Sequence, residues 1–195
     1  MKRAAEIERK TKETQIRAKI DLDGSGRDEV STGVGFFDHM LTLFTVHGLL
    51  DLSVQAEGDI QVDFHHTVED VGLVLGEALN KALGDRKGIG RYGHAVIPMD
   101  DALAEVSIDL SNRPYVKVSL PERLPRQNDF DLSLAQEFFR ALAQKAGMNL
   151  HIRLIYGENW HHMIEAVFKG IGRALRQAVS LDSRVSGVLS SKGSL

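Results

Sequence analysis

The sequence contains no cysteine, which excludes disulfide bonds, thiolate metal ligands and a cysteine nucleophile. It has no apolar run close to the roughly 18 residues of a membrane-spanning helix. Its first residues, MKRAAEIERKTKET, lack the apolar segment of a signal peptide. The net charge of −3 and the isoelectric point near 6.2 give no basic excess to attract nucleic acid or a membrane. We therefore expect a cytoplasmic protein with neither of these partners.

Histidine, in contrast, is concentrated in two short segments. The pattern H-H-x-x-E occurs twice, and its two copies comprise His65, His66, Glu69, His161, His162 and Glu165. A residue type that favours the N-cap of a helix, Asp63 or Asn159, stands two positions before each histidine pair. We therefore expect both pairs in the first turn of a helix.

The segments that carry the two motifs are similar along their whole length. Residues 65–83 and 161–179 align without a gap, and 8 of the 19 positions are identical, including every histidine and glutamate of the motif. This similarity predicts an internal duplication in an α+β fold, with each half a small mixed β-sheet packed against helices. We expect a single domain over residues 1–195. Its first half would be 1–92, and its second half 93–195 with a mobile C-terminal tail.

Hydrophobic periodicity predicts where the helices and strands lie. The predicted helices are 36–48, 65–83, 133–147 and 161–179. The predicted strands are 16–22, a second strand after the turn DGSG, two short strands within 50–64, a strand pair within 102–121 that is broken at 111–114, and 149–157. The segment GIGRYG has the spacing of a dinucleotide-binding loop, but it follows a helix rather than a strand, which argues against that function.

Adjacent histidines on a helix point about 100° apart, so one pair does not comfortably hold one ion. Two ions, each taking a histidine from each motif, are the simpler arrangement. With His39 and His151, the chain offers six histidines and two glutamates, which divide into two sets of three histidines and one glutamate. Such mixed ligands suit manganese with open positions for a substrate, and zinc is the alternative, with fewer ligands. A single histidine pair would more simply cap a helix or lie in the core, but two matched copies favour metal ligands.

Several other side chains are candidates for binding an anion or moving a proton. Basic and hydroxyl groups that could bind an anion are Arg91, Arg113, Lys169, Ser191 and Lys192. Lys169 is the most informative, because the matching position of the first repeat holds apolar Leu73. The tail segment SSKG suits a loop that closes over a phosphate. Glu13 is a candidate acid or base. Singly, each of these charges also fits an ordinary solvated surface residue.

Together these motifs resemble the imidazoleglycerol-phosphate dehydratase family. TGVGFFDHML, FHHTVEDVGLVLGEAL, GIGRYG with PMDDAL, DLSNRP and GENWHHMIEAVFKG all match in order, over nearly the whole chain. Asn112 is a departure, since the family usually has glycine there, but Arg113 stays in register. The resemblance implies a fold like domain 2 of ribosomal protein S5, two Mn²⁺ per active site, and a homo-oligomer of 24 subunits with sites between subunits.

The resemblance also implies roles for the candidate residues. The metal ligands would be His39, His65, His66, Glu69, His151, His161, His162 and Glu165. The phosphate would be held by Arg91, Arg113, Lys169, Ser191 and Lys192. The residues of the catalytic centre would be Glu13, His39, His65, Glu69, His161 and Glu165.

The implied reaction is the dehydration of D-erythro-imidazole-glycerol phosphate to imidazole-acetol phosphate in histidine biosynthesis. The metal would stabilise the substrate's imidazole as imidazolate, which expels hydroxide before ketonisation. A dinuclear metallohydrolase would share the ligands but use metal-bound water as its nucleophile, and a metal-storage protein would need the ions without the anion site. An assay with the imidazole substrate and with a generic phosphate ester distinguishes these alternatives.

Overall fold

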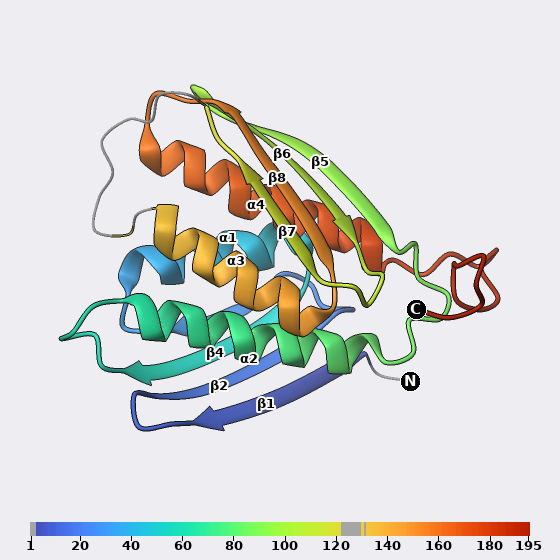
Figure 1. The fold of residues 1–195 in the computed structure, drawn as a ribbon, viewed down its shortest axis with the longest axis horizontal. Coiled ribbons are helices and arrows are strands. Elements are labelled where there is room, and N and C mark those ends of the chain that lie inside the picture. The colour runs from blue at the N-terminus through green and yellow to red at the C-terminus, as the bar shows by residue number, and fades with distance from the viewer. Residues whose placement is uncertain (1–2, 122–129, 131) are drawn as a thin grey trace.

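The computed structural model describes residues 3–121, 130 and 132–195 (Figure 1). The strands are β1 (Ala4–Lys10), β2 (Thr14–Asp21), β3 (Asp28–Ser31), β4 (Asp51–Gly58), β5 (Tyr92–Met99), β6 (Ala102–Asp109), β7 (Tyr115–Ser119) and β8 (Asn149–Tyr156). The helices are α1 (Gly35–Gly48), α2 (His65–Leu83), α3 (Leu132–Ala146) and α4 (Trp160–Val179). Within the described ranges, no helix combines the length and apolar character needed to cross a membrane.

The strands form two sheets with the same topology. The first sheet has the order β1-β2-β4-β3 and the second has the order β5-β6-β8-β7. In each sheet the first strand is antiparallel to the second and the second to the third, whereas the fourth strand pairs with the third in parallel. Because two unrelated halves would have no reason to share this mixed order, the structure confirms the duplicated α+β fold.

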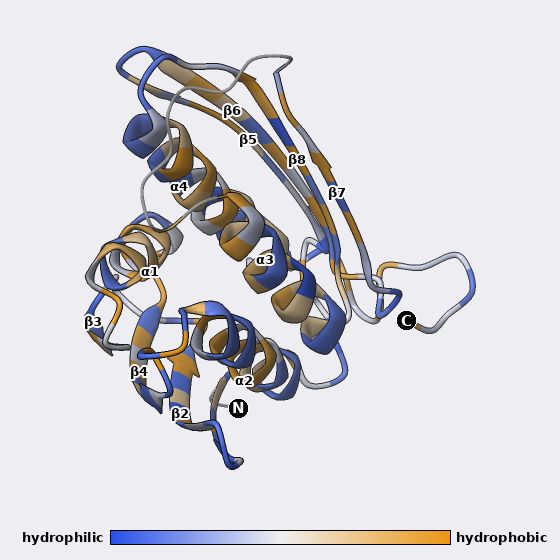
Figure 2. Ribbon diagram, turned by 60° about the vertical axis from the view of Figure 1, so that its left-hand side comes forward, coloured by the Kyte–Doolittle hydropathy of each residue, from blue (hydrophilic) through white to orange (hydrophobic). Residues whose placement is uncertain are grey.

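The four helices lie between the two sheets, which turn their outer faces to solvent (Figures 1 and 2). Helix α2 packs on β1 and β2, and α4 packs on β5 and β6. Along β2 the buried residues Ile16, Ala18 and Ile20 alternate with exposed polar ones, as is usual for a strand with one face on the core. Figure 2 shows this alternation as orange and blue patches along the strands.

The halves are joined because each one packs its shorter helix on the longer helix of the other: α1 contacts α4, and α3 contacts α2. Glycines at matching positions of the repeat allow this close approach. A Cβ added at Gly76 would lie 2.5 Å from the Leu142 carbonyl oxygen, and one at Gly172 would overlap the Phe44 carbonyl oxygen. A backbone atom cannot move aside as a side chain can, so these positions require glycine.

The sequence predicted the helices better than the strands. Helix α2 begins and ends where expected, before Gly84. Strands β1 and β5 were not predicted, because β1 is a charged edge strand and β5 contains both Gly93 and Pro98. The prediction of two strands within 50–64 was wrong: β4 is a single strand, and a turn follows it. The two strands expected as a pair within 102–121 are β6 and β7, but β8 lies between them.

The close helix contact gives a stability prediction. Overpacking in Gly172→Ala should cost about 1–3 kcal/mol. The roughly 1 kcal/mol by which alanine favours a helix over glycine offsets part of this cost, so the free energy of unfolding should fall by up to about 2 kcal/mol. Urea unfolding measures the difference. The control is Gly187→Ala, where an added Cβ meets nothing within 4 Å. A Gly172→Ala protein that is more stable than the parent would contradict this account.

Candidate active site

The start of each long helix places its histidine pair. Asn159 is the N-cap of α4, and its side-chain oxygen accepts a hydrogen bond from the His161 backbone N–H at 2.9 Å. At α2 the N-cap position is Phe64, one residue later than expected, yet the Asp63 carboxylate accepts the His65 backbone N–H at 2.8 Å. Both motifs therefore begin in a first helical turn.

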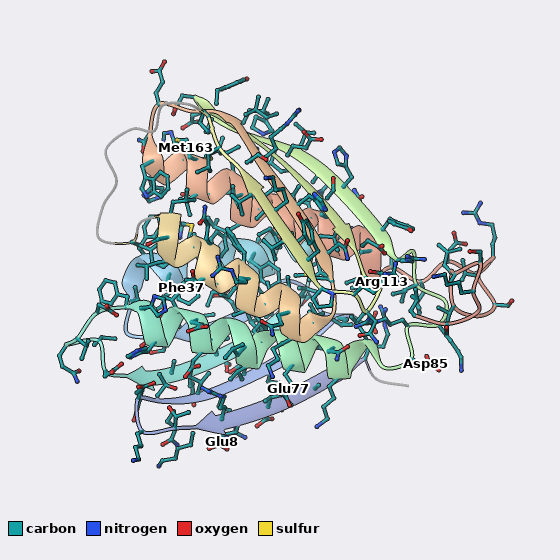
Figure 3. The ribbon with its side chains drawn as sticks, viewed as in Figure 1. Glu8, Phe37, Glu77, Asp85, Arg113 and Met163 are labelled. Atoms are coloured by element: carbon teal, nitrogen blue, oxygen red, sulfur yellow. The ribbon has the colours of Figure 1, made fainter. Side chains whose placement is uncertain are left out.

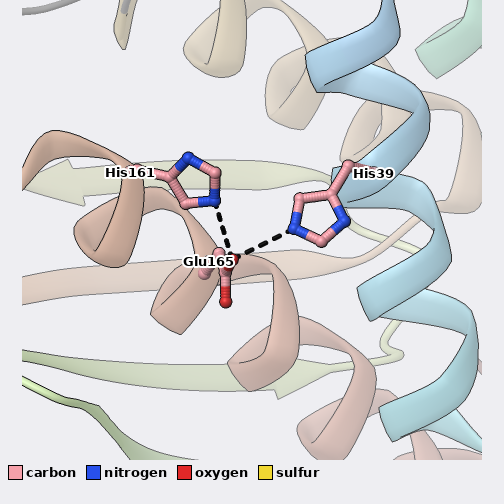
Figure 4. A group of neighbouring side chains, drawn as sticks. All are labelled: His39, His161 and Glu165. Atoms are coloured by element: carbon pink, nitrogen blue, oxygen red, sulfur yellow. Dashed lines mark hydrogen bonds and ion pairs between the residues drawn. The ribbon is translucent and has the colours of Figure 1, made fainter.

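One group of side chains has the geometry of a metal site (Figure 4). The Nε2 atoms of His161 and His39 lie 2.8 Å and 3.0 Å from the same carboxylate oxygen, Oε1 of Glu165. His161 and Glu165 are four residues apart on α4, and His39 comes from α1 because that helix packs on α4. Glu165 is buried, whereas both histidine side chains are nearly half exposed. The group can therefore hold a first-row metal ion and leave positions open for a ligand.

The charge on Glu165 is strongly favoured. Burial raises the pKa of this carboxyl, but hydrogen bonds from Lys169, His39 and His161 outweigh burial and lower it to about 2. The Lys169 ammonium lies 2.6 Å from Oε2, the oxygen that the histidines do not contact. Glu165 is thus ionised at neutral pH, with Oε1 aimed at the histidines and Oε2 held by Lys169.

The first motif forms only part of a matching group. His65 and Glu69 are again four residues apart, and Nε2 lies 3.6 Å from Oε2. Gly172 of α4 faces the Phe44 carbonyl oxygen of α1, and the matching Gly76 of α2 faces the Leu142 carbonyl oxygen of α3. Positions in α1 and α3 therefore differ by 98, and His39 of α1 matches Glu137 of α3. The duplication therefore supplies no third histidine beside His65 from this chain's own facing helix.

The second histidine of each motif is held by an aspartate. His66 Nδ1 lies 3.0 Å from Asp59 Oδ2, and His162 Nδ1 lies 2.5 Å from Asp101 Oδ1. The hydrogen bond to Asp59 raises the pKa of His66, against a smaller effect of desolvation. The hydrogen bond from His162, helped by two backbone N–H groups, lowers the pKa of Asp101 well below its ordinary value. Sequence reasoning missed both aspartates, since neither has a fixed spacing from its histidine.

Glu13 lies near the first motif. It precedes β2 in an exposed turn, and its carbonyl oxygen accepts the Asp59 backbone N–H at 3.2 Å. Its negative charge contributes to the raised pKa of His66. A carboxylate beside a histidine motif is well placed to exchange protons with a molecule bound there.

We call His39, His161 and Glu165 the His39 group. The remaining ligand candidates do not join this group within one chain. Among the described residues, His39, His161 and Glu165 are the one group of three or more histidine and acidic side chains with ligand atoms close enough for an ion. His151 is exposed on β8, with its ring 5.6 Å from that of Tyr115. A chain folded this way can give one ion three ligands, and a second ion needs ligands from elsewhere.

Arg91 is engaged by the protein itself. This buried guanidinium donates to both carboxylate oxygens of Asp109, at 2.7 Å and 3.1 Å, and to the Leu189 carbonyl oxygen at 2.7 Å. Asp109 raises the pKa of Arg91 through this pairing. Arg91 therefore ties the start of the tail to β6, a contact that the sequence did not predict.

The other anion-binding candidates lie far from the histidines of the second motif. Ser191 and Lys192 are exposed in the tail that follows α4, and Arg113 is exposed beside β7. A helix of 20 residues is about 30 Å long, and the motif is at its other end. Figure 3 shows this separation, with Met163 and Arg113 labelled at opposite ends. Among the phosphate-binding candidates, Lys169 is in contact with the His39 group.

A duplicated α+β fold with converging histidine and glutamate side chains defines an enzyme that can hold a metal ion. The model of the imidazoleglycerol-phosphate dehydratase family matches residues 32–175. The imidazoleglycerol-phosphate dehydratase of Desulfosudis oleivorans is 59% identical over 193 residues, 99% of either chain. That of Trichlorobacter lovleyi is 56% identical over 195 residues, 100% of either chain. The chain therefore belongs to the imidazoleglycerol-phosphate dehydratase family, which are hydro-lyases.

Solved structures of the same family share the fold. The imidazoleglycerol-phosphate dehydratase of Staphylococcus aureus superposes with a TM-score of 0.81 at 41% identity, over 92% of this chain and 99% of that one. The structure from Pyrococcus furiosus, determined in a complex, gives 0.84 at 40% identity, over 97% and 100%. Similarity at this level confirms the architecture and the family together.

The ionised state of Glu165 gives a prediction about metal binding. Because its pKa is about 2, protons on Glu165 should not limit metal binding above pH 4. Glu165→Gln should weaken Mn²⁺ binding across pH 5–8 without moving the pH at which affinity is half lost. Calorimetric titration of the metal-free protein measures both quantities. A pH midpoint that shifts by a unit or more in Glu165→Gln would show that Glu165 itself titrates.

Proposed function

We propose that this chain dehydrates D-erythro-imidazole-glycerol phosphate to imidazole-acetol phosphate in histidine biosynthesis, as a cytoplasmic homo-oligomer with two Mn²⁺ in each site. The convergence of His39, His161 and Glu165 carries this proposal. Two nitrogen donors and one carboxylate suit a borderline ion such as Mn²⁺, and the exposed histidine rings leave room for the substrate. His65, His66, Glu69, His151 and His162 are the further ligands that we assign.

The separation of the candidate residues supports sites between subunits. Within one chain the His39 group lies near the start of α4, and the tail that carries Ser191 and Lys192 follows the far end of that helix (Figure 1). A short phosphorylated substrate cannot span about 30 Å, so a neighbouring chain must bring its basic residues to this group. Because the facing helix of the same chain brings no third histidine to His65, we assign the third ligand there to His151 of a neighbouring chain. We adopt 24 subunits as the assembly, and the division at residues 92 and 93 as the boundary of the halves.

The reaction removes hydroxide from the carbon next to the imidazole ring. It removes a proton from the neighbouring carbon, which keeps its own hydroxyl group. When bound, the metal ions supply the Lewis acidity that stabilises the imidazole ring as imidazolate. Glu13 exchanges protons at the reacting carbons, and the departing hydroxide leaves as water. The enol that remains converts to the ketone.

The phosphate is held by charge and by the tail. Lys169, Arg113 and Lys192 provide positive charge, and the Ser191 hydroxyl provides a hydrogen bond. Arg91 also belongs to this group. Its hydrogen bond to the Leu189 carbonyl fixes the point from which Ser191 and Lys192 reach the phosphate. Binding the phosphate excludes water and positions the reacting carbons.

His65→Ala and His161→Ala test the metal site. Each should lower turnover at least about 100-fold, since loss of even an outer partner of a metal ligand costs 10–100-fold. If one site takes the two motifs from different chains, mixing the two inactive proteins and reassembling them should restore activity. Random mixing would leave both motifs intact in about a quarter of the sites. No recovery in a mixed oligomer of confirmed composition would show that both motifs of a site come from one chain.

Substrate assays separate the dehydratase from a dinuclear metallohydrolase. The protein with Mn²⁺ should form the ketone from imidazole-glycerol phosphate and release no inorganic phosphate from a generic phosphate ester. Phosphate release without ketone formation would favour the hydrolase.

Deleting residues 190–195 tests the role of the tail. These residues make local turn contacts, whereas the Arg91 bond holds Leu189, so metal content and thermal stability should change little. The deletion should raise KM and lower kcat, because phosphate binding energy helps to position the reacting carbons. Lys192→Ala should do the same more weakly. Unchanged kcat/KM in the truncated enzyme would identify the segment as an ordinary frayed terminus.

A further inference from the structure

The second histidine of each motif is oriented by an aspartate from a different part of the fold. Asp59 follows β4 and lies seven residues before His66, whereas Asp101 lies in the turn between β5 and β6, sixty-one residues before His162. In both cases the bonded ring atom is Nδ1. A carboxylate accepts rather than donates, so in the neutral ring each Nδ1 carries the proton and each Nε2 keeps its lone pair.

Nε2, which carries that lone pair, is the atom that a metal ion would bind. Of the two ring nitrogens of His162, Nδ1 is bonded to Asp101, and Nε2 is 3.7 Å from Asp100, too far for a hydrogen bond. Metal-binding histidines commonly donate their other ring N–H to a carboxylate, which fixes the tautomer and the ring orientation. The two aspartates provide this arrangement without being ligands themselves.

The duplication reveals that the two aspartates are not equivalent. In the first sheet Ile16 of β2 lies opposite Ala56 of β4, and in the second sheet Ala104 of β6 lies opposite Leu154 of β8. The same correspondence relates Ile20 to Ile108, so positions in β2 and β6 differ by 88 along the chain.

Asp101, just before β6, therefore matches Glu13, just before β2. The position that orients His162 in one half is held by Glu13 in the other. In that half Asp59 bonds the histidine instead, and Glu13 stays exposed.

We propose that Asp59 and Asp101 are positioning residues that fix His66 and His162 in the tautomer with Nε2 available to a metal ion, and that Asp59 frees Glu13 for proton exchange. This inference rests on the proposed metal-dependent function. The matched positions 13 and 101 of the two halves would then have different roles. Asp101 orients a ligand, whereas Glu13 serves the substrate.

Asparagine variants test the proposal. Asp59→Asn and Asp101→Asn keep the size of the side chain but remove the charge, and an amide can offer either an acceptor or a donor to Nδ1. Each should weaken Mn²⁺ binding to the metal-free protein by about 10–100-fold in calorimetric titration. Nitrogen-15 solid-state NMR of histidine-labelled, metal-free protein should show a loss of the Nδ1–H tautomer. Asp85→Asn, an exposed aspartate paired with Lys87 and remote from the motifs, is the matched control and should change neither quantity.

The thermal midpoint of the metal-free protein separates orientation from folding. Asp101 also accepts the backbone N–H groups of Glu158 and Asn159, at 2.5 Å and 2.8 Å, so Asp101→Asn carries some risk to the loop. Asp59→Asn remains decisive in that case, because the Asp59 carboxylate bonds the His66 ring rather than a backbone amide. Unchanged Mn²⁺ affinity and unchanged tautomer signals, or an affinity loss that follows a fall in thermal midpoint, would overturn the positioning role.

Glu13→Gln tests the division of tasks. It should lower kcat by at least about 100-fold, in the usual range for a general acid or base, while Mn²⁺ affinity stays at the parent value. A loss of Mn²⁺ affinity like that of Asp101→Asn would show that Glu13 still orients a ligand. If the parent protein binds no Mn²⁺, the proposed function fails, but the tautomer measurement still decides whether the aspartates orient the rings.

Discussion

The site depends on the close contact of α1 with α4 across the boundary between the two halves. The Phe44 backbone carbonyl lies directly over Gly172, so the helix axes come nearer than any side chain at that position would allow. This contact carries His39 to within 3.0 Å of Glu165, a residue 126 positions further along the chain. A local helix motif brings together two side chains that could bind an ion, and the third side chain here comes from the way the halves pack.

The same constraint explains why the two motifs are not equivalent. The pair α3 and α2 repeats the close contact at Gly76, but the facing helix offers Glu137 where α1 offers His39. Lys169 likewise replaces Leu73, and its ammonium then holds Glu165. Duplication doubled the scaffold and the helical histidines. Differences on the facing helices leave one group with three converging side chains and the other with two.

The predictable parts of this structure are those that depend on local periodicity. Residues 65–83 and 161–179 could be aligned because helix periodicity and motif spacing depend on residues that are close together in the sequence. The family could be identified from motifs of the same local kind. The strand neighbours could not be derived, because β4 and β8 insert between strands that are closer in sequence. The contacts of Asp59 and Asp101 with their histidines were not predicted either, because the two contacts have unrelated sequence spacings.

The length of α4 separates the two groups of side chains that the proposed substrate would have to contact. The first turns of α4 carry His161 and Glu165. Beyond its last turn, the tail that carries Lys192 is held at the Leu189 carbonyl oxygen by Arg91. A phosphate and an imidazole ring on one small substrate are separated by a few bonds, whereas these two ends are separated by about 30 Å. The first motif also lacks a third ligand from its own facing helix, and His151 is exposed on the outer face of the second sheet. Both deficits would be met by the proposed homo-oligomer, in which neighbouring copies place their exposed residues beside the motifs, and assembly would then be a condition of catalysis.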